Sequence, residues 1–267
     1  MTPTQVGMRC PECAGEKTRV IRAPNVLAAQ PRVTIALITA NVLVFIAEVI
    51  QTPSAFSFSG SAYGSLVEKG ALIASLRGNE VLGVAHGQLW RLVTSGFLHE
   101  NILHIAFNMW VLYVFGTMLE RVIGGRRLAI VYFVSLLCGS LLALVTTPHG
   151  ITLGASGAIF GLMGAVVMIL LERGIPIMQS GVGWVIVINL VFSFTMSGIS
   201  WGGHIGGLVG GVLAMGALQL GDRRRSPALG MALCGALAIL AVVGAVLVAH
   251  ASLETGASLL VPTGLVP

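Results

Sequence analysis

The chain has 267 residues, of which 55% are hydrophobic and only 9% carry a charged side chain. Soluble domains carry about 25% charged residues, so this composition excludes a water-soluble globular protein and indicates an integral membrane protein of several spans. The net charge of +5 does not indicate a nucleic-acid partner, because the basic residues fall in short clusters typical of cytoplasmic loops. The 35 glycines indicate close contacts between helices.

The first 31 residues are polar and are expected to form a cytoplasmic tail, whose main motif is Cys-Pro-Glu-Cys at Cys10 and Cys13. A CxxC pair is half of a zinc knuckle. No second pair follows and the first histidine is His86, so Cys10 and Cys13 are weak zinc candidates and an incomplete site is favoured. The first 30 residues contain no apolar core of signal-peptide length, so the first span is expected to be an uncleaved anchor.

Seven apolar segments follow in chain order and are predicted to be transmembrane helices. They cover about residues 33–50, 101–118, 128–145, 156–171, 182–196, 202–220 and 228–249. Glu48 lies near the end of the first segment and is expected to reach the membrane interface. Residues 66–76 are predicted to form a short helix. The stretch 87–99, which contains Trp90, is too apolar for a free loop and too short to span, which favours an interfacial or re-entrant element.

We therefore predict an all-α polytopic membrane protein with four parts. They are the cytoplasmic tail 1–31, a six-helix core 32–220, a cytoplasmic basic loop with the seventh helix 221–250, and an outer tail 251–267. With the N-terminus in the cytoplasm, twelve of the 15 Lys and Arg residues lie on the inner side. This asymmetry predicts a multi-pass cell-membrane protein with a cytoplasmic N-terminus and an outer C-terminus.

This orientation places polar residues of three different segments near the outer face. His104 and Asn108 lie four apart on one face of the second segment, Ser156 begins the fourth, and His204 lies near the start of the sixth. Glycines spaced by three or four permit close approach of the fourth and sixth segments. They are Gly157, Gly161, Gly164, Gly203, Gly207 and Gly211. We therefore expect Ser156 to lie within hydrogen-bond reach of His204.

A serine at this place is either a packing residue or a nucleophile with a base nearby. A neutral imidazole at His204 would take the hydroxyl proton of Ser156 during attack on a carbonyl and return it to the leaving amine. The Ser156 amide at a helix start, with the side chains of His104 and Asn108, would donate hydrogen bonds to the oxyanion. Glu100 is the one acidic residue near the outer ends of these segments, so a Ser–His dyad is favoured over a triad with a carboxylate.

The roles of three residues with ring side chains have alternative interpretations. His99 and His149 lie at interfaces, where solvation is expected, although a local structural hydrogen bond is favoured for His99. Phe160 follows Ser156 by four residues on the same helix face. It is either an ordinary core residue or a ring that packs against the imidazole.

The order of these motifs resembles the rhomboid family of intramembrane serine proteases, in the bacterial form with six helices plus one. The matching motifs are Trp90-Arg91, His104-xxx-Asn108, Gly116-xxx-Glu120-Arg121, Gly154-Ala155-Ser156-Gly157 and His204-xx-Gly207, within about residues 33–220.

The resemblance assigns a role to each motif. It implies that Ser156 is the nucleophile and His204 the base, and that His104, Asn108 and the Ser156 amide form the oxyanion hole. It implies that Phe160 lies beside the catalytic histidine. The supporting residues would be Gly154, Gly157 and Gly207 at the site, Glu120 and Arg121 in the core, and Trp90-Arg91 in a membrane-embedded first loop. The Cys-Pro-Glu-Cys motif looks like a remnant of the zinc-ribbon extension of some bacterial members.

The resemblance also implies a substrate class, namely single-span membrane proteins cleaved within the lipid bilayer near its outer face. It implies that no metal or organic cofactor is required. A substrate helix hides its carbonyl groups, so it must unwind locally before attack. The alternative is a non-catalytic relative that binds membrane proteins, although such relatives typically lack the serine or the histidine. A transport function is disfavoured, because the fourth and sixth segments are almost wholly apolar below Ser156 and His204.

Overall fold

The computed structural model describes residues 2–4, 7–9, 30–57, 64–75, 82–195 and 199–258. Contacts along the chain separate two units, Met1–Gln30 and Pro31–Pro267. Within the first unit, strand β1 (Thr2–Thr4) pairs antiparallel with strand β2 (Gly7–Arg9). The remainder of the fold belongs to the second unit.

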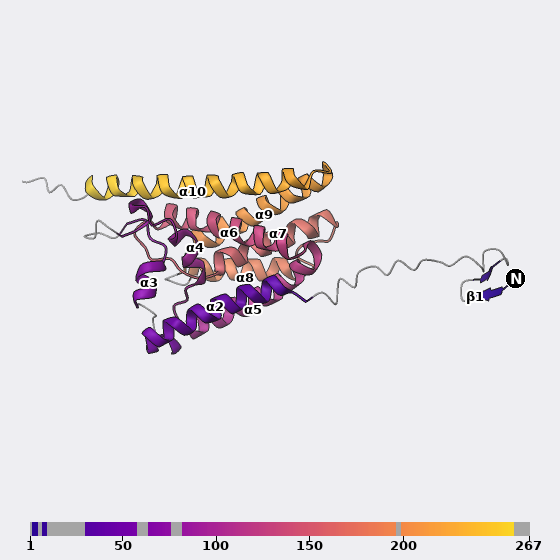
Figure 1. Cartoon of the computed structure of the whole chain (residues 1–267), viewed down its shortest axis with the longest axis horizontal. Coiled ribbons are helices and arrows are strands. Elements are labelled where there is room, and N and C mark those ends of the chain that lie inside the picture. The colour runs from indigo at the N-terminus through magenta and orange to yellow at the C-terminus, as the bar shows by residue number, and fades with distance from the viewer. Residues whose placement is uncertain are drawn as a thin grey trace, which may run out of the picture. The chain divides into compact units, whose positions relative to one another are not determined.

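The second unit contains nine α-helices among its described residues (Figure 1). They are α2 (Arg32–Gln51), α3 (Ser65–Gly70), α4 (Arg91–Thr94), α5 (Ile102–Ile123), α6 (Gly125–Thr146), α7 (Ser156–Glu172), α8 (Val182–Thr195), α9 (Trp201–Arg223) and α10 (Pro227–Ser258). Short 3-10 turns lie at Pro53–Phe56, Val84–His86 and Ser95–Phe97. Helices α2, α5, α6, α9 and α10 are long and apolar enough to cross a membrane, and α7 and α8 are shorter apolar helices. Apart from the two short strands of the first unit, the described residues form an all-α polytopic membrane protein, as predicted.

The seven apolar helices coincide with the seven predicted segments, and the differences lie at their ends. Helix α5 runs on to Ile123 and α10 to Ser258, beyond the predicted ends. The charged residues Glu120 and Arg121 do not end α5, which continues to Ile123. It ends before Gly124, which has a φ of 82°, because a glycine with positive φ commonly terminates a helix. The short helix predicted at 66–76 is shorter in the structure, at Ser65–Gly70.

Helices α6, α7 and α9 pack through two rows of glycine on α9. The rows are Gly206 and Gly210 against α6, and Gly207 and Gly211 against α7. A Cβ atom on Gly207 would overlap the carbonyl group of Gly157, and one on Gly211 would overlap that of Gly161. The backbones of α7 and α9 are therefore in direct contact, which is a main source of packing energy between membrane helices.

Two glutamates hold α2 against the bundle. Glu120 of α5 accepts hydrogen bonds from the N–H of Val33 at 2.9 Å and from the N–H and hydroxyl of Thr34 at 2.8 and 2.7 Å, which satisfies free amides at the start of α2. Glu48 is only 2% exposed and accepts from the backbone N–H of His99 at 3.2 Å. The prediction that Glu48 reaches the interface is wrong, because the loop before α5 supplies a buried donor to its carboxyl group.

The stretch between α3 and α5 folds into short helical turns that Arg91 anchors. Its guanidinium group donates to the carbonyl oxygens of Glu68 and Ala71, both at 2.7 Å, and to Oε1 of Gln88 at 2.6 Å. The Arg91 side chain is thereby buried with its donors satisfied. The described residues of this region, 71–75 and 82–101, therefore form a packed element of the unit, as its apolar sequence indicated, and they contain no helix long enough to span.

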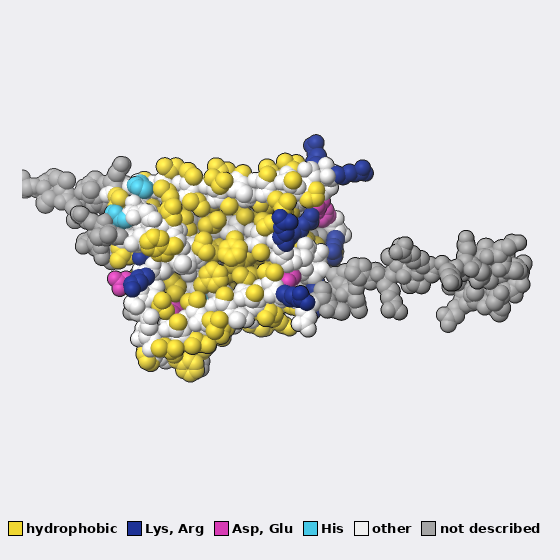
Figure 2. Space-filling view, in the orientation of Figure 1, with side chains coloured by type: hydrophobic (Ala, Val, Ile, Leu, Met, Phe, Trp, Pro, Cys, Tyr) yellow, Lys and Arg dark blue, Asp and Glu magenta, His cyan; other side chains and the backbone are white. Residues whose placement is uncertain are grey.

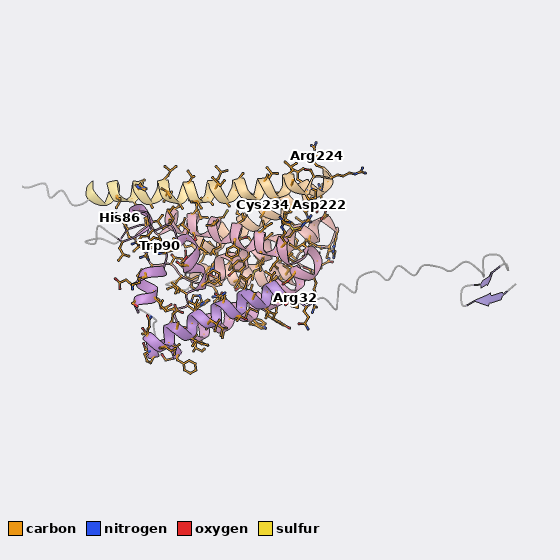
Figure 3. The ribbon with its side chains drawn as sticks, viewed as in Figure 1. Arg32, His86, Trp90, Asp222, Arg224 and Cys234 are labelled. Atoms are coloured by element: carbon orange, nitrogen blue, oxygen red, sulfur yellow. The ribbon has the colours of Figure 1, made fainter. Side chains whose placement is uncertain are left out.

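The helical unit has an apolar flank and charged ends. Hydrophobic side chains cover the middle of the face in Figure 2, and most of the Lys and Arg side chains on that face gather at one end. Figure 3 shows Arg32, Asp222 and Arg224 at that end, with His86 and Trp90 at the other. This distribution fits a bundle whose flank contacts lipid and whose ends contact water.

The substitution Gly211→Ala is expected to destabilise the bundle, because its Cβ would overlap backbone atoms of Gly161. We expect the free energy of unfolding to fall by about 1–3 kcal/mol, measured as a lower midpoint of thermal unfolding in detergent. Gly216→Ala on the same helix is the matched control, since the nearest atom to its Cβ would be Cε of Met168 at 3.7 Å. Equal midpoints for the two variants would contradict the packing described above.

Candidate active site

Ser156 is the first residue of α7 and follows a turn held by backbone hydrogen bonds. The turn begins at an antiparallel bridge between Thr152 and Leu72, with both N–H···O distances at 2.9 Å. Gly154 then takes a φ of 121°, a conformation that favours glycine, and donates its N–H to the carbonyl of Ser95 at 2.9 Å. These contacts fix the half-buried Ser156, whose own N–H lies at a helix start and has no partner within the helix.

His204 reaches Ser156 from the first turn of α9. Ser200 caps this helix, and its Oγ accepts from the N–H of Gly203 at 3.2 Å. Nε2 of His204 lies 2.7 Å from Oγ of Ser156. The ring of Phe160, one turn after Ser156, stacks on the imidazole with centroids 4.3 Å apart and 18° between the planes. The structure shows both features that were predicted as alternatives for Phe160, because its ring stacks on the imidazole and is also buried in the hydrophobic core.

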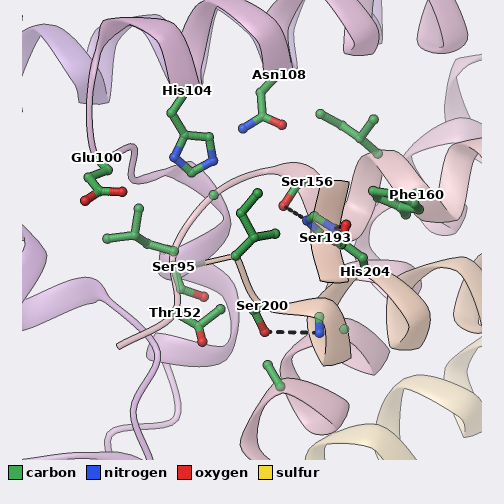
Figure 4. A pocket seen from close by; sticks show the side chains of 18 of the residues that line it. Ser95, Glu100, His104, Asn108, Thr152, Ser156, Phe160, Ser193, Ser200 and His204 are labelled. Carbon is green, nitrogen blue, oxygen red and sulfur yellow. Dashed lines mark hydrogen bonds between the residues drawn. The ribbon is translucent and has the colours of Figure 1, made fainter. Parts of the chain in front are cut away.

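The side chains of Ser156, Phe160 and His204 line a cavity of about 670 Å³, together with two side chains from α5 (Figure 4). His104 and Asn108 extend from neighbouring turns of α5 toward Ser156. Asn101 caps α5 by accepting the N–H of His104 at 3.0 Å. Nδ2 of Asn108 is buried and has no hydrogen-bond partner among the described residues. It is therefore available to donate to a group that enters the cavity.

The cavity brings together the groups that acyl transfer requires. A hydroxyl lies against an imidazole nitrogen, and hydrogen-bond donors lie across the cavity from them. No group of three or more His, Cys, Asp or Glu side chains that could hold a metal ion occurs within the described part of the chain. Cys10 and Cys13 lie outside the described residues, so their zinc prediction stays a prediction.

Comparison with known proteins places the site in a family. The sequence profile of the Rhomboid domain matches residues 86–220, about half of the chain, and this range includes Ser156, His204, His104 and Asn108. The chain belongs to the rhomboid family. It is 40% identical over 140 residues to "Rhomboid protease GluP" of Bacillus subtilis (strain 168), a match that covers 51% of this chain and 27% of that protein.

Two further rhomboid relatives match a similar part of the chain. "Putative rhomboid protease YdcA" of Bacillus subtilis (strain 168) is 37% identical over 148 residues, which covers 54% of this chain and 74% of that protein. "Rhomboid-like protease 3" of Toxoplasma gondii is 31% identical over 131 residues, which covers 47% of this chain and 50% of that protein. The chain thus spans about a quarter of GluP but most of YdcA.

This rhomboid protein has a third residue at the imidazole that the sequence analysis missed. Ser193 of α8 is buried, and its Oγ is hydrogen-bonded to Nδ1 of His204. Asn189 and Ser193 lie one helix turn apart in a segment that is otherwise apolar from Val182 to Phe194. Polar residues inside a transmembrane helix indicate a function by default, so this pair is the signal that could have identified Ser193.

His99 lies against the site and is fully buried. Its ring meets that of His104 edge-on, with centroids 5.1 Å apart and 71° between the planes. Burial, followed by repulsion from His104, lowers the pKa of His99 well below its usual value, which keeps this imidazole neutral. Solvation of His99 is therefore the wrong alternative. The backbone N–H of His99 donates to Glu48, but neither ring nitrogen has a hydrogen-bond partner among the described residues, so the local hydrogen bond favoured for this side chain is not seen. His149 is exposed, as expected.

The substitution Gly154→Ala is expected to slow the labelling of Ser156 by a fluorophosphonate about 10-fold to 100-fold. Its Cβ would lie 2.8 Å from Nε2 of His104, and a φ of 121° is unfavourable for alanine. Gly174→Ala is the matched control, because Gly174 also has a positive φ, of 66°, but open space around its Cβ position. The measurement is a time course of labelling in detergent, and similar rates for the two variants would refute the role given to Gly154.

Proposed function

We propose that this rhomboid protein is an intramembrane serine endopeptidase that cleaves the transmembrane segments of single-span membrane proteins. The observation that carries the proposal is the 2.7 Å contact between Oγ of Ser156 and Nε2 of His204, in a cavity where Asn108 has an unpartnered donor. The names of the bacterial relatives, which include a rhomboid protease, support the same class of activity.

In the proposed reaction, Oγ of Ser156 attacks the carbonyl carbon of the scissile peptide bond while Nε2 of His204 takes the hydroxyl proton. The resulting imidazolium gives this proton to the leaving nitrogen as the C–N bond breaks, which releases the amine product and leaves an acyl group on Ser156. A water molecule then attacks the ester, again with His204 as base. Proton return to Oγ releases the carboxylic acid product and restores Ser156.

The tetrahedral intermediate of each step carries a negative oxygen, and we assign its donors to three groups. They are the side chains of His104 and Asn108 and the backbone N–H of Ser156, which lies at the positive end of the α7 dipole. Gly154 supports this arrangement because it leaves room for His104. Phe160 supports His204 by stacking on its ring.

The helix contact between Gly157 and Gly207 also supports the site. A side chain on Gly207 would overlap the Gly157 carbonyl group, so any larger residue would push α9 away from α7. Such a movement would lengthen the contact between Nε2 of His204 and Oγ of Ser156. We therefore assign both glycines a supporting role in the proposed reaction.

The position of the cavity supports a membrane-embedded substrate. Leu103 and Phe107 of α5 and Phe192 of α8 line the cavity and are each more than half exposed on the flank of the bundle. A transmembrane segment in the lipid could therefore contact the cavity directly. Its carbonyl groups are hydrogen-bonded within its own helix, so a short stretch must unwind before Ser156 can attack.

We further propose the membrane orientation and the division of the chain that the basic residues predict. The N-terminal tail 1–31 lies in the cytoplasm and the C-terminal tail 251–267 outside, with the core at 32–220 and the basic loop and seventh helix at 221–250. In this orientation the start of α7 faces the outer half of the membrane, so cleavage occurs near the outer face. No cofactor and no nucleic-acid partner enter the proposal.

A non-catalytic rhomboid-like protein that binds or sorts membrane proteins is the alternative function. A binding site needs the cavity but has no need for a hydroxyl held against an imidazole nitrogen. The Ser156–His204 contact therefore favours the protease.

The experiment that tests the proposal is labelling of the detergent-solubilised protein with a fluorescent fluorophosphonate. Wild type is expected to be labelled, and Ser156→Ala and His204→Ala are expected to lose labelling by about 10²-fold or more, since they remove the nucleophile and the base. His149→Ala, which changes an exposed histidine outside the cavity, should be labelled at the wild-type rate.

A second measurement uses co-expressed single-span membrane proteins as substrates and detects their cleavage products. Products that depend on both Ser156 and His204 would support the endopeptidase. A folded wild-type protein that resists the probe and cleaves none of a broad panel of single-span proteins would contradict the endopeptidase and favour the binding function.

A further inference from the structure

Ser193 lies beside His204 in the cavity (Figure 4), and its hydroxyl group connects the imidazole to the backbone of α8. Its Oγ is within hydrogen-bond distance of Nδ1 of His204, and it lies 2.7 Å from the carbonyl oxygen of Asn189. The Ser193 side chain is only 3% exposed, so bulk water does not compete for these bonds. The partner of Nδ1 is therefore a neutral hydroxyl that the helix backbone itself holds in place.

The directions of these hydrogen bonds follow from the number of hydrogens available. A serine hydroxyl has one hydrogen, and the carbonyl oxygen of Asn189 can only accept, so the hydroxyl hydrogen of Ser193 points to that oxygen. The lone pairs of Oγ then face Nδ1 of His204, which must be the donor. A neutral imidazole carries one N–H, so Nε2 has the free lone pair. Nε2 is the nitrogen that lies 2.7 Å from Oγ of Ser156.

We propose that Ser193 is a positioning residue that keeps the His204 proton on Nδ1, so that Nε2 is free to take the proton of Ser156. The inference rests on the proposed function and extends it from a dyad to a chain of hydrogen bonds. This chain runs from Ser156 through His204 and Ser193 to the Asn189 carbonyl.

The hydrogen bond between Nδ1 of His204 and Ser193 acts in both proton transfers that form the acyl group. When Nε2 takes the proton of Ser156, Nδ1 keeps its own hydrogen, and the bond to Ser193 becomes a charge-assisted one that stabilises the imidazolium. When Nε2 gives the proton to the leaving amine, the ring returns to the tautomer it started from. Without Ser193, the alternative tautomer would place a hydrogen on Nε2 facing Ser156, and this form cannot act as a base.

The test measures fluorophosphonate labelling over a range of probe concentrations, which separates probe binding (KI) from the chemical step (kinact). Ser193→Ala is expected to lower kinact by about 10-fold to 100-fold, the size of effect found when a metal-binding histidine loses the partner that orients it, with KI changed by less than about 2-fold. Ser193→Thr retains an oxygen that can accept from Nδ1 and bond the carbonyl four residues earlier, so it should recover most of kinact. Ser193→Cys, with a weaker acceptor of similar size, should fall between alanine and wild type.

The matched control is Ser135→Ala on α6. Ser135 is also buried, and its hydroxyl donates to the carbonyl of Val131 four residues earlier at 2.6 Å, but it does not line the cavity. This variant therefore loses the same kind of hydroxyl without changing the imidazole. It should keep kinact within about 2-fold of wild type.

The outcomes separate this inference from the function on which it rests. A labelled wild type with a Ser193→Ala variant of equal kinact would overturn the role of Ser193 and leave the protease intact. A fall in kinact that neither Thr nor Cys restores, accompanied by a lower unfolding midpoint, would also overturn it, because Ser193 would then act through packing alone. An unlabelled, folded wild type would overturn the proposed function and the inference together.

Discussion

Direct backbone contact between α7 and α9 is the constraint on which the site depends. Lipid chains are as apolar as leucine, so a membrane bundle gains little from burying apolar side chains, and close packing of small residues takes their place. Gly207 and Gly211 lie against the carbonyl groups of Gly157 and Gly161. No side chain therefore fits between the two helices at these positions. A serine at the start of one helix and a histidine at the start of the other then meet at 2.7 Å. The same approach allows Phe160 to stack on the imidazole, so the packing of the helices and the geometry of the site have one cause.

Polar groups inside this bundle have two different functions. Glu120, Glu48 and Arg91 are hydrogen-bonded to backbone groups of other elements, and each joins a helix start or a loop to the core. In a medium without water such bonds are costly to leave unmade, so they fix the loop that precedes α5 and the first turn of α2. The amide of Asn108 differs, because its Nδ2 is buried beside the cavity without a partner in the described part of the chain. In the proposed reaction, this donor would bind the negative oxygen of the tetrahedral intermediate.

The surroundings of His204 show how an imidazole can be oriented without a carboxylate. Its Nε2 faces Ser156 and its Nδ1 faces Ser193, while Phe160 covers one face of the ring. These three contacts come from two helices, α7 and α8, and together they restrain the position and the tilt of the ring, while the bond to Ser193 is the one to which we assign the tautomer. A neutral hydroxyl costs less to bury in a membrane than a carboxylate does. In the proposed reaction, the cost would be a weaker stabilisation of the imidazolium, since hydrogen bonds to a charged partner are the stronger ones.

The sequence by itself determined the membrane class, the seven apolar helices and the glycine spacing, because composition and helical periodicity are local properties of the chain. It also identified Ser156, His204, His104 and Asn108 as candidates, since polar residues stand out in apolar helices and the motif order resembles rhomboids. Only the tertiary structure decided what each of them contacts. Glu48 is buried because a loop 51 residues further along the chain supplies its donor, and His99 is buried against a ring of α5. Ser193 became part of the site because α8 packs beside the start of α9, and contacts between helices depend on how the bundle closes rather than on the spacing within any one segment.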